Sequence, residues 1–220
     1  MTGKPRFTRV ERALIARLNT PSKVQRWLNA LRYNTEEQGE TQHSFRRVLQ
    51  LRTAHCMEAA LFAAVVLEQH GYPPLVMSLA SKDWLDHVIF IYRHASGWGS
   101  VARSRDPGLH GRKPRFRSQR QLAMSYYDSY VDYTGRLRGF GVANLDKAMG
   151  NYDWRLTTRN VWAVERMLID LPHKKVRSSD RRYRQLLKRY KEYRRTHDDR
   201  KPIYYRGRDR WEPIPQEFRR

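Results

Sequence analysis

The chain has 220 residues, of which 40% are hydrophobic and 12% aromatic, enough for one compact domain with room for an appendage. Lys and Arg number 44 against 22 Asp and Glu, and the net charge of +22 favours an acidic partner, of which nucleic acid is the commonest. One cysteine excludes an internal disulfide, and we find neither a signal peptide nor a segment apolar enough to span a membrane. We therefore expect a soluble, cytoplasmic protein.

An N-terminal helical region is predicted for residues 1–44. Residues 10–18 have the apolar spacing of a short amphipathic helix. Residues 20–34 predict a second helix, with Thr20 as its N-cap and a proline in its first turn. Residues 44–52 fit either a short helix or a strand.

The most apolar helical pattern surrounds the only cysteine. Thr53 is the expected N-cap, which places Cys56 in the first turn of the helix. Residues 59–67 are almost entirely apolar, so this helix should be central and buried. Gly71 is well placed to end it.

Short β-rich runs follow the helix. Residues 74–80 predict one strand, and residues 86–94 and 97–104 are expected to pair as a hairpin. Residues 104–118 contain glycines and prolines and predict a loop. Farther on, residues 135–156 are irregular in pattern and lie between two predicted helices.

The last fifty residues, 171–220, form a basic extension with 18 Lys and Arg against 7 Asp and Glu. Residues 178–197 in this extension predict a basic helix. Its thin apolar stripe consists of Tyr183, Leu186, Leu187, Tyr190 and Tyr193. The helix either packs this stripe on the main domain or binds nucleic acid through its basic face.

The position of the cysteine points to chemistry. The thiolate is the reactive form of cysteine, and the positive end of a helix lowers the pKa of a thiol. The unpaired N–H groups of the first turn can also hold the oxyanion that forms when a carbonyl is attacked. The alternative is that Cys56 packs as a small hydrophobic side chain.

A thiol nucleophile needs a base and a group that orients the base. His87 starts an apolar strand run, and Asp106 follows the second strand of the expected hairpin, which would bring the two together. A structural histidine and an Asp-Pro-Gly turn are the alternatives. Asp86 is a second candidate orienter, ranked lower because neighbours on a strand face opposite sides.

The order of these features resembles the transglutaminase-like core. The resemblance is carried by "HCMEAALFAAVVLEQHGYPPLV", "DHVIFIY", "GWGSV" and "RDP", and it covers residues 45 to 110. It implies an α+β, papain-like fold in which a central helix, with the cysteine at its start, packs on an antiparallel sheet. It also implies that Cys56, His87 and Asp106 form a catalytic triad. In papain-type proteases a glutamine six residues before the cysteine helps to hold the oxyanion, and Gln50 has that spacing here.

The resemblance implies a catalytic domain over residues 45–170 with the basic extension behind it. One departure is Val88-Ile89, where the family usually has a small residue followed by Trp, and this bears on substrate details more than on the triad. The expected activity is that of a cysteine peptidase or amidase that forms a thioester on Cys56. Hydrolysis is preferred over acyl transfer because water needs no second pocket.

The expected substrate is a protein, a peptide or a small amide. The basic runs favour an acidic or phosphorylated one through electrostatic steering. No motif predicts a metal site or a nucleotide cofactor. The alternative function is a basic nucleic-acid-binding protein with a non-catalytic papain-like scaffold, although no nucleic-acid-binding signature accompanies the charge.

Overall fold

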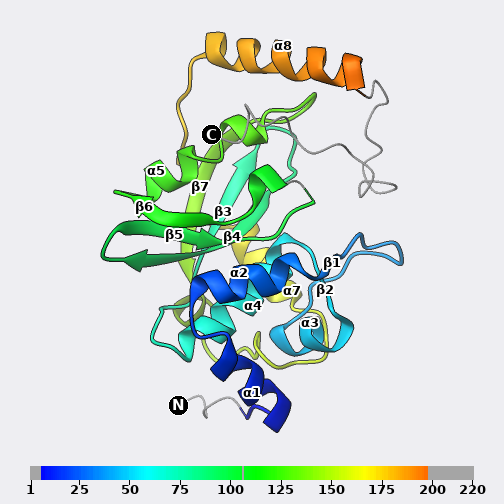
Figure 1. Cartoon of the computed structure of the whole chain (residues 1–220), viewed down its shortest axis with the longest axis vertical. Helices are drawn as coiled ribbons and strands as arrows, with labels where there is room; N and C mark the ends of the chain where they lie inside the picture. The colour runs from blue at the N-terminus through cyan, green and yellow to red at the C-terminus, as the bar shows by residue number, and fades with distance from the viewer. Residues whose placement is uncertain (1–5, 106, 198–220) are drawn as a thin grey trace.

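The computed structural model of the chain describes residues 6–105 and 107–197. They form a mixed α+β fold around a six-stranded antiparallel sheet with the strand order β6-β5-β4-β3-β7-β8 (Figure 1). The sheet strands are β3 (Leu75–Ser81), β4 (His87–His94), β5 (Gly97–Val101), β6 (Arg112–Phe116), β7 (Leu137–Asn144) and β8 (Lys174–Lys175). A separate parallel pair joins β1 (Arg32–Tyr33) to β2 (Thr53–Ala54).

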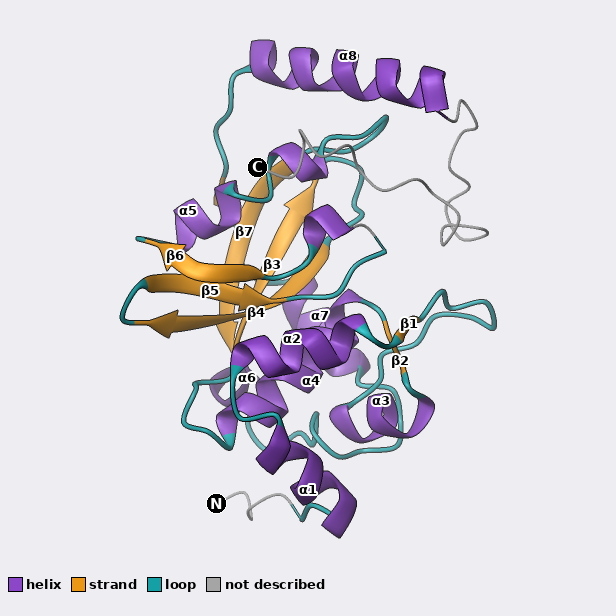
Figure 2. Ribbon diagram, viewed as in Figure 1, coloured by secondary structure: helices purple, strands orange, loops and turns teal. Residues whose placement is uncertain are grey.

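Helices cover both faces of the sheet. Figure 2 shows α1 to α4 and α7 on one side, with α5 and α8 on the other. The α-helices of the described residues are α1 (Arg9–Arg17), α2 (Pro21–Asn29), α3 (Phe45–Leu51), α4 (Cys56–Glu68), α5 (Gln119–Met124), α6 (Leu145–Met149), α7 (Trp162–Ile169) and α8 (Asp180–His197). Two short 3-10 turns, η1 (Pro107–Leu109) and η2 (Asp128–Tyr130), lie in the connections.

Strand alternation divides the apolar residues into two cores. In β4, Val88 and Phe90 face α4, whereas Ile89 and Ile91 face the second core on the other side. Both faces of this strand are covered, which explains why its sequence reads as a continuous apolar run. The β4–β5 hairpin forms as predicted, with His94 opposite Gly97 at the turn.

The two predicted N-terminal helices are confirmed, and they pack into the same core as α4. Thr20 is the N-cap of α2, and its side chain accepts a hydrogen bond from the Lys23 N–H at 3.3 Å. Trp27 of α2 stacks on Phe62 of α4, with ring centroids 4.3 Å apart.

Helix α4 is the central buried helix that the sequence predicts. All its residues from Met57 to Leu67 are buried. The predicted N-cap at Thr53 is wrong, because His55 caps the helix and Cys56 is its first residue. Arg52 ends α3 in a left-handed conformation (φ 59°), and the chain then runs extended through β2 before α4 begins.

Two segments contain strands that the sequence did not indicate. Residues 104–118, predicted as a loop, contain β6. Residues 135–156, predicted as irregular, contain β7, which pairs along its whole length with β3. Its glycines hid this strand: a Cβ at Gly141 would lie 2.7 Å from the end of the Leu171 side chain, because the chain passes close to the strand at this point.

The basic extension contributes to the fold in the part that is described. Strand β8 pairs with the edge of β7, and α8 packs Leu186 and Tyr190 into the second core. Packing of the apolar stripe on the main domain is thus confirmed for these two residues, and Tyr183 and Leu187 are partly buried against the same core. The side chain of Tyr193 lies outside the described part. Within the residues that the structure describes, no helix has the length and apolarity needed to cross a bilayer.

Candidate active site

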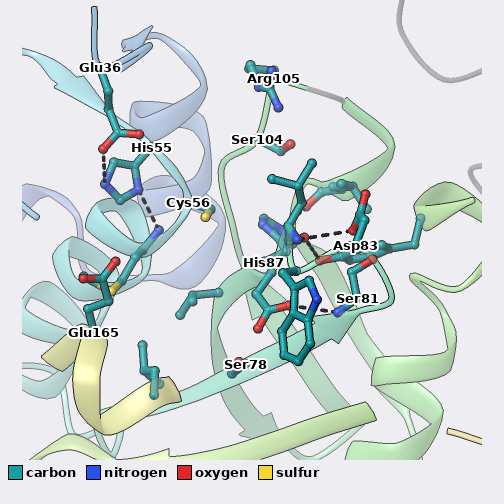
Figure 3. Close-up of a pocket in the computed structure, with 18 of the residues that line it drawn as sticks. Glu36, His55, Cys56, Ser78, Ser81, Asp83, His87, Ser104, Arg105 and Glu165 are labelled. Carbon is teal, nitrogen blue, oxygen red and sulfur yellow. Dashed lines mark hydrogen bonds and ion pairs between the residues drawn. The ribbon is translucent and has the colours of Figure 1, made fainter. Parts of the chain in front are cut away.

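Cys56 and His87 meet in a cavity of about 400 Å³ at one end of the sheet (Figure 3). Cys56 comes from the start of α4 and is partly exposed, and His87 is the first residue of β4 and is buried. His87 faces the thiol closely enough to lower the pKa of Cys56. The structure therefore brings together two of the three residues expected in a triad.

His87 is held at both ring nitrogens. Its Nε2 lies 2.8 Å from the carbonyl oxygen of Leu109, which can only accept, so Nε2 carries a proton and donates it. The other nitrogen, Nδ1, is therefore the one available to the thiol of Cys56. This arrangement fixes the ring orientation and leaves the Nδ1 lone pair of the neutral ring facing sulfur.

The expected third member, Asp106, lies outside the described residues. Among those described, the group at His87 Nε2 is the Leu109 carbonyl. The rival orienter Asp86 accepts a hydrogen bond from the Ser81 N–H at 2.9 Å and so caps the end of β3.

Gln50 is not brought to the cavity. Its side chain is exposed on α3 and accepts a hydrogen bond from the Arg47 guanidinium at 3.1 Å. The left-handed turn at Arg52 and the strand β2 separate α3 from α4, so the six-residue spacing does not place Gln50 beside the thiol.

Tyr33 and Gln42 are two of the other polar side chains that line the cavity. Burial raises the pKa of Tyr33 and the charge of the Cys56 thiolate raises it further, whereas Arg105 lowers it, so the phenol stays protonated. Gln42 donates to the carboxylate of Glu165 at 2.7 Å. Tyr33 is therefore the better placed of the two to donate a hydrogen bond near the thiol.

A second imidazole, His55, also contacts the thiol. Burial raises the pKa of Cys56, but hydrogen bonds from His55 and His87, together with their positive charge, outweigh it and bring the pKa well below the ordinary value. The α4 N-terminus acts in the same direction. The site thus favours a thiolate.

Both ring nitrogens of His55 have hydrogen-bond partners. In the neutral ring, Nε2 donates to the Thr41 carbonyl at 2.9 Å and Nδ1 accepts from the Met57 N–H at 3.3 Å. A second proton would go on Nδ1 and would replace the hydrogen bond that this nitrogen accepts from the Met57 N–H. Burial lowers the pKa of His55, but its hydrogen bond to Cys56 and the charge of Glu58 raise it to about 10.

Glu58, in the first turn of α4, anchors this arrangement. Its carboxylate is fully buried and accepts from the backbone N–H groups of His55 at 2.9 Å and His43 at 3.0 Å. It also accepts from the side chains of Thr41 and Asn34, each at 3.0 Å. Burial raises the pKa of Glu58, but the hydrogen bond to His43 and the charge of His55 lower it to about 2.

The spacing of His55 and Glu58 was the signal that sequence reasoning missed. A capping residue followed three positions later by Glu is the pattern of a capping box, and here histidine takes the place usually held by Ser or Thr. That pattern places the helix start at Cys56 and puts an imidazole next to the thiol.

Within residues 6–105 and 107–197 there is no group of three or more His, Cys, Asp or Glu side chains arranged to hold a metal ion. The chain matches no protein-family model and no curated protein. The interpretation of the site therefore rests on its own geometry.

Proposed function

We propose that this protein is a transglutaminase-like cysteine enzyme that cleaves an amide or peptide bond through a thioester on Cys56. The observation that carries the proposal is the contact between the thiol at the start of α4 and His87, whose other ring nitrogen is fixed by Leu109, within an open cavity. A cysteine that only filled space would gain nothing from this arrangement.

The reaction begins with proton transfer from Cys56 to Nδ1 of His87. The thiolate attacks the carbonyl carbon, so that a C–S bond forms and the carbonyl π electrons move onto oxygen. When the tetrahedral intermediate collapses, the C–N bond breaks and His87 returns the proton to the leaving amine. The acyl group is then held as a thioester.

Water completes the reaction in the preferred route. His87 removes a proton from water, the hydroxyl adds to the thioester, and the C–S bond breaks to release an acid and regenerate the thiolate. An amine in place of water would give acyl transfer. Hydrolysis is preferred because water needs no additional binding pocket.

The oxyanion is proposed to be held by the backbone N–H of Cys56 and the hydroxyl of Tyr33. The first N–H groups of a helix have no acceptor within the helix, so the Cys56 N–H is suited to this role. Tyr33 is favoured over Gln50 because it lines the cavity and interacts with the thiolate charge.

A papain-like fold is part of the same proposal. In papain-like enzymes the nucleophile lies at the start of a helix that packs on an antiparallel sheet, and the base lies on a strand of that sheet. Here α4 packs more extensively on β4 than on any other strand.

The proposal is tested by trapping the acyl intermediate. The full chain is mixed briefly with p-nitrophenyl esters of N-acetylated peptides, and its intact mass is measured. We expect one acyl adduct, mapped to Cys56, with much slower formation in His87→Ala and normal formation in the control His94→Ala at the opposite end of β4. Adducts that form equally in Cys56→Ala would refute the proposal.

The exposed basic face of α8 keeps nucleic-acid binding as a second candidate function. Its exposed cations, among the side chains that the structure describes, are Arg181, Arg182, Arg184, Lys188, Arg189, Lys191 and Arg195. This function predicts that the protein retains DNA or RNA at low salt and releases it steeply as salt rises, with no change in Cys56→Ala. Failure to retain either polymer at low salt would exclude it.

A further inference from the structure

The cavity around Cys56 is acidic in a strongly basic protein. Six carboxylates line it, on Glu36, Glu40, Asp83, Asp86, Asp132 and Glu165. Among the described residues that line it, Arg105 is the one Lys or Arg, and it hydrogen-bonds to Tyr33. This charge is opposite to the net charge of +22 carried by the whole chain.

The carboxylates stand on both sides of the thiol. Figure 3 shows Glu36 and Glu165 on one side of Cys56 and His87, with Asp83 on the other. Glu165 belongs to α7, whereas Asp83 belongs to the connection between β3 and β4. A ligand that contacts both groups must therefore extend across the reactive sulfur.

These carboxylates lack the partners that acidic residues find elsewhere in the protein. Away from the cavity, Glu11 pairs with Arg46 at 2.7 Å and Glu68 with Arg155 at 2.8 Å. Among the described residues, none of the six cavity carboxylates forms an ion pair with Lys or Arg.

Glu36 faces the His55 ring, 3.8 Å from Nε2, and the hydrogen bonds to the other carboxylates come from neutral groups. Asp83 accepts from the Thr134 hydroxyl at 2.9 Å, and Asp132 accepts from the Gly135 N–H at 2.7 Å.

Neighbouring carboxylates of the cavity repel one another, which raises their pKa values. Burial raises the pKa of Asp132, and the charge of Asp83 raises it further. Burial likewise raises the pKa of Glu165, with a further rise caused by Glu40. A bound cation would relieve this repulsion, because an opposite charge nearby favours the ionised carboxylate.

Trp84 supplies an independent indication of a cationic ligand. It lines the cavity, yet its side chain is 84% exposed, the highest value among the large exposed hydrophobic residues described. Its backbone is left-handed (φ 65°), which is unusual for a bulky residue and holds the indole out between Asp83 and Leu85. An exposed indole next to carboxylates is a suitable surface for a guanidinium or ammonium group.

We propose that the acyl substrate is a basic peptide segment, with Arg or Lys side chains on both sides of the amide bond that Cys56 attacks. This inference rests on the proposed function and specifies its substrate. It reverses the acidic substrate expected from net charge, because the charge that faces a ligand at the site is set by the cavity walls. A small cation could not contact carboxylates on both sides of the thiol at once.

The test separates binding from catalysis. Three blocked hexapeptides that differ only in having Arg, Gln or Glu around the same central amide are titrated into the full-length Cys56→Ala protein, and their dissociation constants are measured by calorimetry. We expect the Arg peptide to bind at least about tenfold more tightly than the Gln peptide, and the Glu peptide to bind most weakly.

Matched variants locate the effect. Asp86→Asn and Glu40→Gln each remove one exposed carboxylate from the cavity wall. Each should weaken binding of the Arg peptide by about threefold to fivefold. Asp180→Asn, which removes a carboxylate paired with Arg136 away from the cavity, should leave binding unchanged.

Two binding results would overturn the inference: equal or tighter binding of the Glu peptide, or equal binding of free agmatine and the Arg peptide. Charge-selective binding by Cys56→Ala combined with no thioester in the wild-type chain would support the cavity as a binding site for basic peptides and refute the proposed function, and with it the role of such a peptide as acyl substrate.

Discussion

Replacing Glu58 with glutamine should destabilise the protein and should do so mainly at neutral pH. The Glu58 carboxylate accepts hydrogen bonds from four donors. Two are the backbone N–H groups of His55 and His43, and two are the side chains of Thr41 and Asn34. A glutamine amide would turn an NH2 group toward some of these donors. Buried donors left without an acceptor are costly.

The size of the effect follows from the pKa. The pKa of Glu58 falls from an ordinary value of 4.5 to about 2 in the folded protein. A shift of that size corresponds to about 3 kcal/mol of stability. Because the folded pKa is the lower one, this contribution is fully present above about pH 5 and is lost as pH falls toward 2.

The assay is urea unfolding followed by tryptophan fluorescence at pH 7 and pH 3. Glu58→Gln should lower the free energy of unfolding by about 3 kcal/mol at pH 7 and by clearly less at pH 3. The control Glu37→Gln, an exposed residue in the same loop as Glu36, should change it by less than about 0.5 kcal/mol. An effect of the same size at both pH values would refute the ionic role of Glu58.

Two further substitutions test other parts of the account. Tyr33→Phe should lower kcat by about a hundredfold while leaving alkylation of Cys56 by iodoacetamide unchanged, because it removes an oxyanion donor and not the base; an unchanged kcat would exclude Tyr33 from this role. Gly141→Ala should destabilise the protein by about 1 kcal/mol in urea unfolding, because the new Cβ would lie 2.7 Å from the end of the Leu171 side chain, which must shift. Most of that loss should disappear in a Leu171→Ala background, and a loss that persists there would contradict the steric explanation.

The central part of the fold could be predicted because its signals are local. The unbroken apolar pattern of α4 and the β4–β5 runs around a short turn each specify one structure. Strand β7 could not be predicted in the same way. Its glycines read as breaks in the chain, and the reason for Gly141 is a contact with Leu171, thirty residues away.

In the site, too, local signals could be read from the sequence and contacts between distant segments could not. Cys56 at a helix start and His87 at a strand start were visible in the sequence, and the structure brings them together. Gln50 was misplaced because spacing along the chain was used without the turn at Arg52. The acidity of the cavity was hidden because its carboxylates come from separate segments, while the composition of the whole chain indicates the opposite charge.

The most direct measurement is the rate of Cys56 alkylation by iodoacetamide as a function of pH, in the wild-type chain and in His87→Ala. The wild-type rate should rise with an apparent pKa well below the ~8.5 of a free thiol, and His87→Ala should move this pKa upward. The control His94→Ala should follow the wild type. A wild-type profile with an ordinary thiol pKa, unchanged by His87→Ala, would contradict the claim that His87 activates Cys56.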